Sequence, residues 1–275
     1  MLDLRAIRTL LIDCDGVLWR GDEPLPGLER FFAVLDRRGI QWVLISNNPN
    51  RMPAEYIAKL ARFGVRARPE QVFTSPLALA YTLCDLYPPG TAFYVLAEEA
   101  LKAPLREAGF VLFEGEERPD QPITAVVTGN NRAATYPMLA VATQLIHEGA
   151  AYYATNIDRT YMTSEGIMPG SGWLREVLFT ATGVEPIVTG KPHPGIFRAA
   201  LRRFNAAPET TAMLGDRMDT DIKGARAVGI GAILVLSGVT HREDLPRYDY
   251  QPALIYEHIG ALADDLEKAG GGSDG

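Results

Sequence analysis

The sequence predicts an α/β fold with a largely parallel sheet that helices cover on both faces. Two observations support this fold class: continuous apolar runs of strand length recur along the chain, and amphipathic helical patterns separate them. Apolar runs of this kind are typical of strands buried on both faces. Hydrophobic residues make up 47% of the 275 residues, an ordinary value for a globular chain, and the length allows one large domain or two smaller ones.

Each expected strand is a short apolar run. In chain order the runs are Thr9–Cys14, Trp42–Ser46, Ala92–Leu96, Ile123–Thr128, Ala151–Thr155, Thr211–Gly215 and Ala232–Leu236. A helix is expected over Pro194–Phe204, because its apolar residues fall on one stripe and its arginines fall outside that stripe. Strands that alternate with such helices indicate parallel pairing.

Two polar loops in the middle of the chain, Glu114–Pro122 and Asp158–Gly172, indicate an inserted unit between two halves of one core. The last residues, AGGGSDG, are rich in glycine and have nothing to bury, so we expect a flexible terminus.

The composition limits the partners and the location. The net charge of -7 argues against nucleic acid or an anionic membrane as the main partner, because both favour clustered Lys and Arg. Cys14 and Cys84 are too few for a disulfide framework, which indicates a reducing compartment. No segment reaches the roughly 18 apolar residues of a membrane-spanning helix. We therefore expect a cytoplasmic protein with no nucleic-acid or membrane partner.

Polar residues follow the apolar runs, at the positions where ligands bind in open α/β sheets. Carboxylates, an ammonium group, and hydroxyl and amide side chains could converge there on one edge of the sheet. They are Asp13, Asp15, Asp216, Asp219, Asp221, Lys191, Ser46, Asn47 and Asn48. Carboxylates this close repel one another unless a cation lies among them, and Asp oxygens suit Mg²⁺ that shares its site with a phosphate.

The spacing of Asp13 and Asp15 suits phosphoryl transfer. In an extended chain their side chains point the same way, about 6–7 Å apart. One carboxylate can attack phosphorus, while the other protonates the leaving oxygen and later takes a proton from water. Lys191, Ser46 and Asn47 would hold and neutralise the phosphate.

These motifs resemble those of a known superfamily. The set DCDG, SNN, GKP and GDRMDTDIKGA resembles the four motifs of the haloacid dehalogenase (HAD) superfamily, in order, between residue 10 and about residue 230. The strings DCDGVLWRGDEPLPG, SNNP and TGKPHPGIF resemble subfamily IIA, the NagD-like phosphatases and 4-nitrophenylphosphatases. The resemblance implies a Rossmann-like, doubly wound parallel core with an inserted α/β cap domain of the kind that subfamily IIA carries.

The resemblance also implies the reaction, a Mg²⁺-dependent hydrolysis of small phosphomonoesters through an aspartyl-phosphate. Asp13 would be the nucleophile and a metal ligand. Asp15 would be the general acid and base, with its backbone carbonyl on the metal. Lys191 would neutralise the phosphate and orient the nucleophile.

The remaining core roles concern the phosphate and the metal. The Ser46 side chain and the Asn47 backbone would bind the phosphate. Asp216 would be a direct metal ligand, with Asp221 bound through water or as a neighbouring partner. Asp219 is left out, because an acid at a helix start is common in any case.

The resemblance divides the chain into a core domain, residues 1–77 and 188–275, and an inserted cap, residues 78–187. Relatives often dimerise through the cap, so a homodimer is a further expectation.

One cap segment, ATNIDRTYMTSEGIMPGSG, resembles the substrate-facing loop that is usually written TNxDxxxP. By position Asn156, Asp158 and Tyr161 would face the leaving group. Met162 stands where proline is usual, and Asn131 stands in GNNR where the cap motif often reads GxDR. The leaving group therefore stays open among sugar phosphates, phosphoglycolate, nucleotides and pyridoxal phosphate.

Other functions use similar residues. The same aspartyl-phosphate could pass to another acceptor in a phosphotransferase or phosphomutase, although Asp15 favours water. A non-catalytic module that binds a phosphoryl ligand is a further alternative. Trp19 and Arg20 could either close over the site or pack at the edge of the core.

Overall fold

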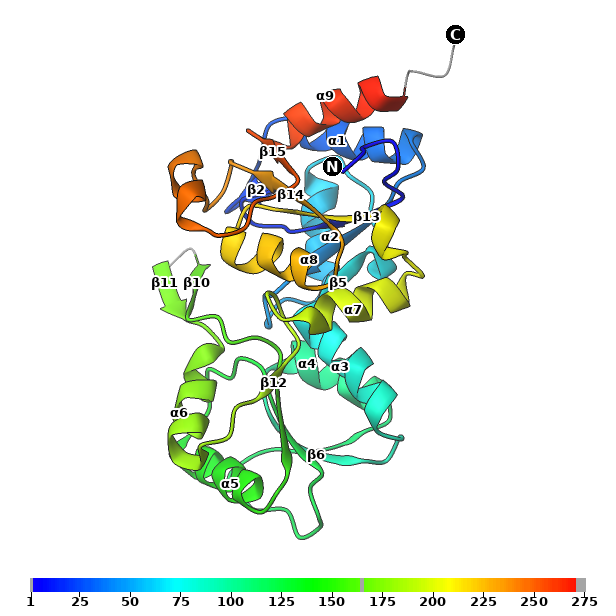
Figure 1. The fold of residues 1–275 in the computed structure, drawn as a ribbon. Helices are drawn as coiled ribbons and strands as arrows, with labels where there is room; N and C mark the ends of the chain where they lie inside the picture. Colours follow the sequence, from blue (N-terminus) through cyan, green and yellow to red (C-terminus); the bar gives the residue numbers. More distant parts are fainter. Residues whose placement is uncertain (1, 164–165, 271–275) are drawn as a thin grey trace. The chain divides into compact units, whose positions relative to one another are not determined.

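A computed structural model describes residues 2–163 and 166–270 of the chain, drawn as a ribbon in Figure 1. The described chain divides into two compact units. Within the described residues, the first unit comprises residues 2–46, 53–73 and 191–270, and the second comprises residues 47–52, 74–163 and 166–190. Each unit contains its own sheet and is described by itself.

The first unit is built on a six-stranded sheet in the order β15-β14-β13-β1-β4-β5. β1 pairs in parallel with β4 and with β13, and β13, β14 and β15 continue in parallel. The strands are β1 (Thr9–Ile12), β4 (Gln41–Ser46), β5 (Val72–Thr74), β13 (Thr211–Gly215), β14 (Gly231–Val235) and β15 (Leu254–Tyr256). Because these five paired strands are parallel, their carboxyl ends lie at one edge of the sheet.

Helices and short turns complete the first unit. The helices are α1 (Leu28–Arg37), α2 (Pro53–Arg62), α7 (Pro194–Arg203), α8 (Lys223–Ala227) and α9 (Ile259–Gly270). A π-helical turn, Met218–Ile222, precedes α8, and the strands β2 (Trp19–Arg20) and β3 (Glu23–Pro24) form an antiparallel pair. Turns of 3₁₀ type lie at Pro69–Gln71, Pro208–Thr210 and Arg242–Arg247.

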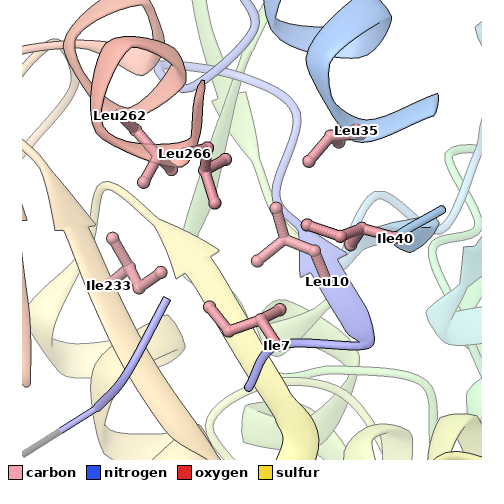
Figure 2. Close-up of a pocket in the computed structure, with 7 residues that line it drawn as sticks. All are labelled: Ile7, Leu10, Leu35, Ile40, Ile233, Leu262 and Leu266. Atoms are coloured by element: carbon pink, nitrogen blue, oxygen red, sulfur yellow. The ribbon is translucent and has the colours of Figure 1, made fainter. Parts of the chain in front are cut away.

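One part of the core of the first unit lies between the sheet and the helices α1 and α9. Figure 2 shows Leu10, Ile233, Leu35, Leu262 and their neighbours converging on a gap that is lined by apolar residues and too narrow to admit a water molecule. Packing of this density is normal for a protein interior, so the gap is not a ligand site.

The second unit contains a five-stranded sheet in the order β12-β9-β8-β6-β7, with every neighbouring pair parallel. Its strands are β6 (Ala92–Leu96), β7 (Val111–Phe113), β8 (Ala125–Thr128), β9 (Ala151–Ala154) and β12 (Ile187–Val188). Its helices are α3 (Ser75–Leu86), α4 (Glu99–Glu107), α5 (Tyr136–His147) and α6 (Gly172–Thr182).

Both faces of this second sheet are buried. Along β6, Phe93 and Val95 belong to one apolar cluster, together with residues of α3 and α4. Tyr94 and Leu96 point the other way, into a cluster with residues of α5 and α6. Successive strand residues point to opposite faces, so a strand that is apolar throughout needs helices on both sides. The predicted α/β class is confirmed.

The predicted elements agree with the structure in most places. The runs Ala92–Leu96 and Thr211–Gly215 are strands with the expected ends, and the expected helix at Pro194 is α7. The strands β5, β7, β12 and β15 were missed, because two or three residues are too few to show a pattern.

One loop prediction was wrong. The segment Asp158–Gly172 contains an antiparallel pair, β10 (Thr160–Thr163) and β11 (Gly166–Pro169), rather than loop alone. The predicted flexibility of residues 271–275 and the side chain of Met162 lie outside the described residues. Among the helices of the described ranges, none is long and apolar enough to cross a membrane.

Candidate active site

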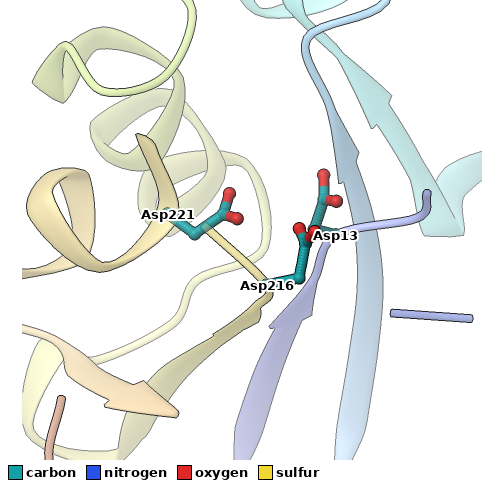
Figure 3. A group of neighbouring side chains, drawn as sticks. All are labelled: Asp13, Asp216 and Asp221. Carbon is teal, nitrogen blue, oxygen red and sulfur yellow. The ribbon is translucent and has the colours of Figure 1, made fainter. Parts of the chain in front are cut away.

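Three carboxylates meet at the carboxyl edge of the first sheet. Asp13 follows β1, Asp216 follows the neighbouring parallel strand β13, and Asp221 lies on the π-helical turn that comes next. One carboxylate oxygen from each lies within 4.8 Å of the other two, and Figure 3 shows the three side chains side by side. Strand pairing thus brings together residues that are far apart in the sequence.

Lys191 bridges two of these carboxylates. Its side chain is 4% exposed, and its Nζ donates to Oδ1 of Asp13 over 2.5 Å and to Oδ1 of Asp221 over 2.7 Å. Burial alone would lower the pKa of Lys191, but the charges and hydrogen bonds of Asp13 and Asp221 outweigh it and raise the pKa. The ammonium group therefore stays charged.

The same burial acts on the acids. It raises the pKa of Asp13 well above its usual value, Lys191 opposes this rise, and the charge of Asp221 adds to it. Burial, followed by the charge of Asp221, raises the pKa of Asp216 to about 7. Carboxyl groups with raised pKa values favour the ionised form again when a cation is bound beside them.

Asp216 is the least satisfied of the three acids. Its Oδ2 accepts a hydrogen bond from the backbone N–H of Val239 over 2.7 Å. Its Oδ1 is buried and has no hydrogen-bond partner within the described ranges. A buried carboxylate oxygen without a partner is costly, so this atom is suited to a ligand.

Glycine backbone surrounds this acid. A Cβ added to Gly238 would overlap Oδ2 of Asp216, and a Cβ added to Gly16 would lie 2.5 Å from the same oxygen. Asp221 in turn fills the space in which a side chain at Gly215 would lie. The sequence interpretation missed Gly238 and Val239, although the string SGVT follows β14 as a polar turn at a strand end.

The residues present fit a divalent cation. Three carboxylates and one ammonium group leave two negative charges without compensation when all are ionised. The donors are hard oxygen atoms, which Mg²⁺ prefers, and Oδ1 of Asp216 lacks any other partner in the described structure. Asp13, Asp216 and Asp221 could therefore hold Mg²⁺.

Asp15 lies apart from the three-acid group. β1 ends at Ile12, so both Asp13 and Asp15 follow the strand rather than extend it. The Asp15 side chain is exposed, and its Oδ1 accepts a hydrogen bond from Nε1 of Trp19 over 2.9 Å. Trp19 is fully buried, so of the two alternatives it packs in the core.

Two further charged residues, Arg20 and Asp219, make contacts outside the three-acid group. Arg20 donates through its guanidinium to the backbone carbonyl of Ser237, with the shorter bond at 2.6 Å, and so holds the turn that contains Gly238. Asp219 forms an ion pair with Arg217 at 2.8 Å and lies outside the three-acid group.

The predicted phosphate-binding residues make different contacts. Ser46 is 5% exposed and accepts a hydrogen bond from the hydroxyl of Tyr56 over 2.8 Å. Within the second unit, Nδ2 of Asn47 donates to Oδ2 of Asp158 over 3.1 Å, and the carbonyl of Asn47 accepts from Asn156 over 2.7 Å. The structure thus brings Asn47 together with two of the predicted substrate-facing residues.

The other residues of the second unit that the sequence singled out, Tyr161 and Asn131, do not share these contacts. Tyr161 lies on β10 and is partly buried. Asn131, which departs from the usual aspartate, follows β8 and accepts a hydrogen bond from the backbone N–H of Ala133 over 3.0 Å. The adjacent Asn130 is buried, and both polar atoms of its amide lack a partner among the described residues.

Comparisons with known proteins agree with this geometry. A family described as "Haloacid dehalogenase-like hydrolase" matches residues 10–111, and one described as "HAD-hyrolase-like" matches residues 188–262. A dihydroxyacetone phosphatase of Corynebacterium glutamicum is 35% identical over 254 residues, which cover 92% of this chain and 90% of the relative. The chain belongs to the haloacid dehalogenase-like hydrolases.

Solved structures place this hydrolase more closely. A 4-nitrophenylphosphatase of Thermotoga maritima aligns over 96% of this chain and 98% of its own, with a TM-score of 0.86 and 31% identity. A glycerol phosphate phosphatase of Mycobacterium tuberculosis, solved in complex with magnesium, aligns over 97% of this chain and 80% of its own, with a TM-score of 0.85 and 31% identity. The predicted relation to subfamily IIA is confirmed.

Proposed function

We propose that this hydrolase is a Mg²⁺-dependent phosphatase of small phosphomonoesters that works through an aspartyl-phosphate on Asp13. The observation that supports it best is the buried Lys191, which bridges Asp13 and Asp221 beside the unpartnered oxygen of Asp216. A metal bound there would supply positive charge to the transferred phosphoryl group and to the acids around it.

The chain's own residues would carry out two displacements. An oxygen of Asp13 forms a bond to phosphorus while the bond from phosphorus to the leaving oxygen breaks, and that oxygen takes a proton from Asp15. Water then attacks the phosphorus, Asp15 takes the proton of that water, and the bond to Asp13 breaks to release inorganic phosphate. Lys191 holds Asp13 in place during both displacements.

The remaining assignments concern the phosphate and the metal. The Ser46 hydroxyl and the Asn47 backbone would bind phosphate oxygens. The metal would take side-chain oxygens of Asp13 and Asp216 and the backbone carbonyl of Asp15, with Asp221 nearby. The donor types support this set, because hydroxyl and amide groups suit an anion and carboxylates suit a hard cation.

The second unit would form the cap, over about residues 78–187, with Asn156, Asp158 and Tyr161 toward the leaving group. Relatives named dihydroxyacetone phosphatase and glycerol phosphate phosphatase support a small phosphorylated polyol or sugar as the substrate class. A cytoplasmic location, a homodimer through the cap, and action without nucleic acid or membrane complete the proposal. The low number of cysteines and the net charge of -7 support the location and the partners.

Replacement of the nucleophile tests this function. Asp13→Asn should lower the rate of 4-nitrophenyl phosphate hydrolysis in Mg²⁺ by about 10⁴-fold or more, because an amide does not form the phosphoryl intermediate. Asp36→Asn, at an exposed acid of the same unit, is the matched control and should keep full activity. Retained activity of a folded Asp13→Asn variant would refute the assignment.

The phosphotransferase alternative has its own test. In water labelled with ¹⁸O, hydrolysis places the label in the released phosphate, whereas transfer to an organic acceptor does not. The Corynebacterium glutamicum relative is named a phosphatase, which favours hydrolysis and therefore label in the released phosphate.

A further inference from the structure

Two buried aromatic side chains of the first unit hold residues of the proposed site without belonging to it. Trp19 and Tyr56 are 0% and 1% exposed, and their ring centroids lie 6.5 Å apart. Trp19 donates to Asp15, and Tyr56 donates to Ser46. The proposed proton-transfer group and the proposed phosphate-binding hydroxyl are therefore attached to neighbouring rings.

The contact of Trp19 restricts a side chain that is otherwise mobile. Asp15 is exposed, and exposed side chains exchange rotamers within nanoseconds. The indole N–H of Trp19 only donates, and its ring is fixed in the core, so the 2.9 Å bond holds one carboxylate oxygen in place. The second oxygen of Asp15 is left to exchange a proton.

The contact of Tyr56 sets the direction of another proton. The hydroxyl of Tyr56 is the donor, so Oγ of Ser46 is the acceptor of this 2.8 Å bond. A fixed donor on Oγ sets the position of the serine oxygen and restricts the directions in which its own O–H can point. Donation is what a phosphate oxygen requires from Ser46.

The helix α2 contacts both rings, because it carries Tyr56 and its Lys59 lies over the ring of Trp19. Tyr56 lies on this helix, and Lys59 follows three residues later, so both point to about the same side of the helix. Nζ of Lys59 lies 4.5 Å from the centroid of the Trp19 ring and donates to the backbone carbonyl of Gly21 over 2.5 Å. A cation over an indole face stabilises the ring in that orientation.

We propose that Trp19 and Tyr56 are positioning residues of the phosphatase reaction: Trp19 orients the Asp15 carboxylate for proton transfer, and Tyr56 orients the Ser46 hydroxyl for phosphate binding. The proposal rests on the proposed function. It predicts a different kinetic defect for each residue, because proton transfer acts in the transition state and phosphate binding acts in the ground state as well.

Two pairs of variants test the proposal. Trp19→Phe keeps an aromatic ring and removes the N–H. Its control is Trp42→Phe, which removes a partly buried indole bond to Asp36; Trp42 lies near the start of β4 and Ser46 at its end. Tyr56→Phe removes the hydroxyl, and its control is Tyr94→Phe, which removes a partly buried hydroxyl bond to the carbonyl of Gly115. The melting temperature of each variant shows how far the substitution lowers stability rather than catalysis or phosphate binding.

The readouts are steady-state hydrolysis of 4-nitrophenyl phosphate and calorimetric binding of inorganic phosphate, both in Mg²⁺. Trp19→Phe should lower kcat by about tenfold or more and change KM by less than about twofold. Tyr56→Phe should weaken phosphate binding by about 3- to 10-fold, with a smaller loss in kcat. Both control variants should stay within about twofold of the wild-type chain.

The outcomes separate this inference from the proposed function. If Trp19→Phe and Tyr56→Phe match their controls in kcat and in phosphate affinity while the wild-type chain is active, the two residues are structural and the inference is wrong. An equal loss of kcat and affinity in both variants would also overturn the assigned roles. A wild-type chain that hydrolyses no phosphomonoester would overturn the proposed function and, with it, this inference.

Discussion

The two sheets of the molecule have the same parallel arrangement but carry different polar residues at the ends of their strands. Both are parallel and carry polar residues at the carboxyl ends of their strands. In the first unit Asp13 and Asp216 follow β1 and β13, whereas in the second Asn130 and Asn156 follow β8 and β9. The strand-end rule predicts where polar groups gather, and their charge decides which ligand they suit.

We call the strand ends that carry Asp13 and Asp216 the charged edge, and those that carry Asn130 and Asn156 the amide edge. The charged edge suits a cation, and the amide edge suits hydroxyl groups. Oδ1 of Asp216 and the amide of Asn130 are both buried without a partner among the described residues. A carboxylate in that position favours a metal, whereas a carboxamide both donates and accepts hydrogen bonds without carrying charge. We therefore expect substitutions at the first edge to abolish the reaction and substitutions at the second to change substrate preference.

The largest effect is expected at Lys191. Lys191→Met removes the ammonium between Asp13 and Asp221 and should lower kcat by about 10³-fold, because a preorganised charge is lost. Without metal, the free energy of unfolding should fall by about 3–5 kcal/mol, the usual loss when one partner of a buried pair is removed. Steady-state kinetics and urea unfolding measure the two changes.

The control for this variant lies in the second unit. Lys102 pairs with Glu114 in a more exposed setting, and Lys102→Met should cost less than about 1 kcal/mol and leave kcat unchanged. If both variants lost equal amounts of kcat and of unfolding free energy, the proposed distinction between the two units would be wrong.

The next effect concerns the glycine beside Asp216. Gly238→Ala forces the carboxylate to move, because the added Cβ would overlap Oδ2, and the affinity for Mg²⁺ should fall by about 10- to 100-fold. Calorimetric titration measures this affinity. Gly231→Ala is the control, since its Cβ meets only side-chain atoms, the nearest being the end of Leu2 at 2.8 Å. Unchanged Mg²⁺ affinity in Gly238→Ala would contradict the proposed ligand role of Asp216.

A smaller effect is the pH dependence of stability. The pKa of Asp216 is about 7 in the folded chain against an ordinary value of 3.8, so the folded state binds more protons between these limits. The metal-free chain should therefore be most stable below about pH 4 with respect to this group, and lose that stability as the pH rises through 7. The raised pKa of Asp13 acts in the same direction.

Bound Mg²⁺ should reverse this loss, because it requires ionised carboxylates. We expect the rise in melting temperature on adding Mg²⁺ to be about 5 °C larger at pH 8 than at pH 5, which corresponds to one or two kcal/mol for a chain of this size. Scanning calorimetry with sodium chloride at matched ionic strength measures it. A larger rise at pH 5 would show that the acids do not bind the metal.

The smallest effect is expected at the amide edge. Asp158→Asn weakens the bond from Asn47 but keeps an acceptor, so KM for glycerol phosphate should change about 2- to 10-fold relative to KM for 4-nitrophenyl phosphate. The exposed Asp120→Asn serves as control. A parallel change in KM for both substrates would indicate that Asp158 acts on the phosphate through Asn47 rather than on the leaving group.

Much of the charged edge could be predicted from sequence. Asp13, Lys191 and Asp216 follow apolar runs or known motifs, and strand pairing brings such positions together. The strands β6 and β13 were predictable for the same reason, because a fully buried strand has a clear apolar pattern.

The surroundings of these residues could not be predicted in this way. The contacts of Tyr56 with Ser46 and of Gly238 with Asp216 depend on how helices and turns pack on the sheet, which no sequence pattern reveals. The bond from Trp19 to Asp15 depends on a turn that no periodic pattern reveals. The antiparallel pair β10 and β11 was missed because its strands are short and lie in a polar segment.

The most direct measurement is a calorimetric titration of Mg²⁺ into the metal-free chain, with hydrolysis of 4-nitrophenyl phosphate followed in parallel. We predict that one Mg²⁺ binds per chain, that activity returns in proportion to the bound metal, and that Asp216→Asn loses both. Full activity after exhaustive removal of divalent metals, or an Asp216→Asn variant that binds Mg²⁺ as tightly as the wild-type chain, would contradict the proposed metal site.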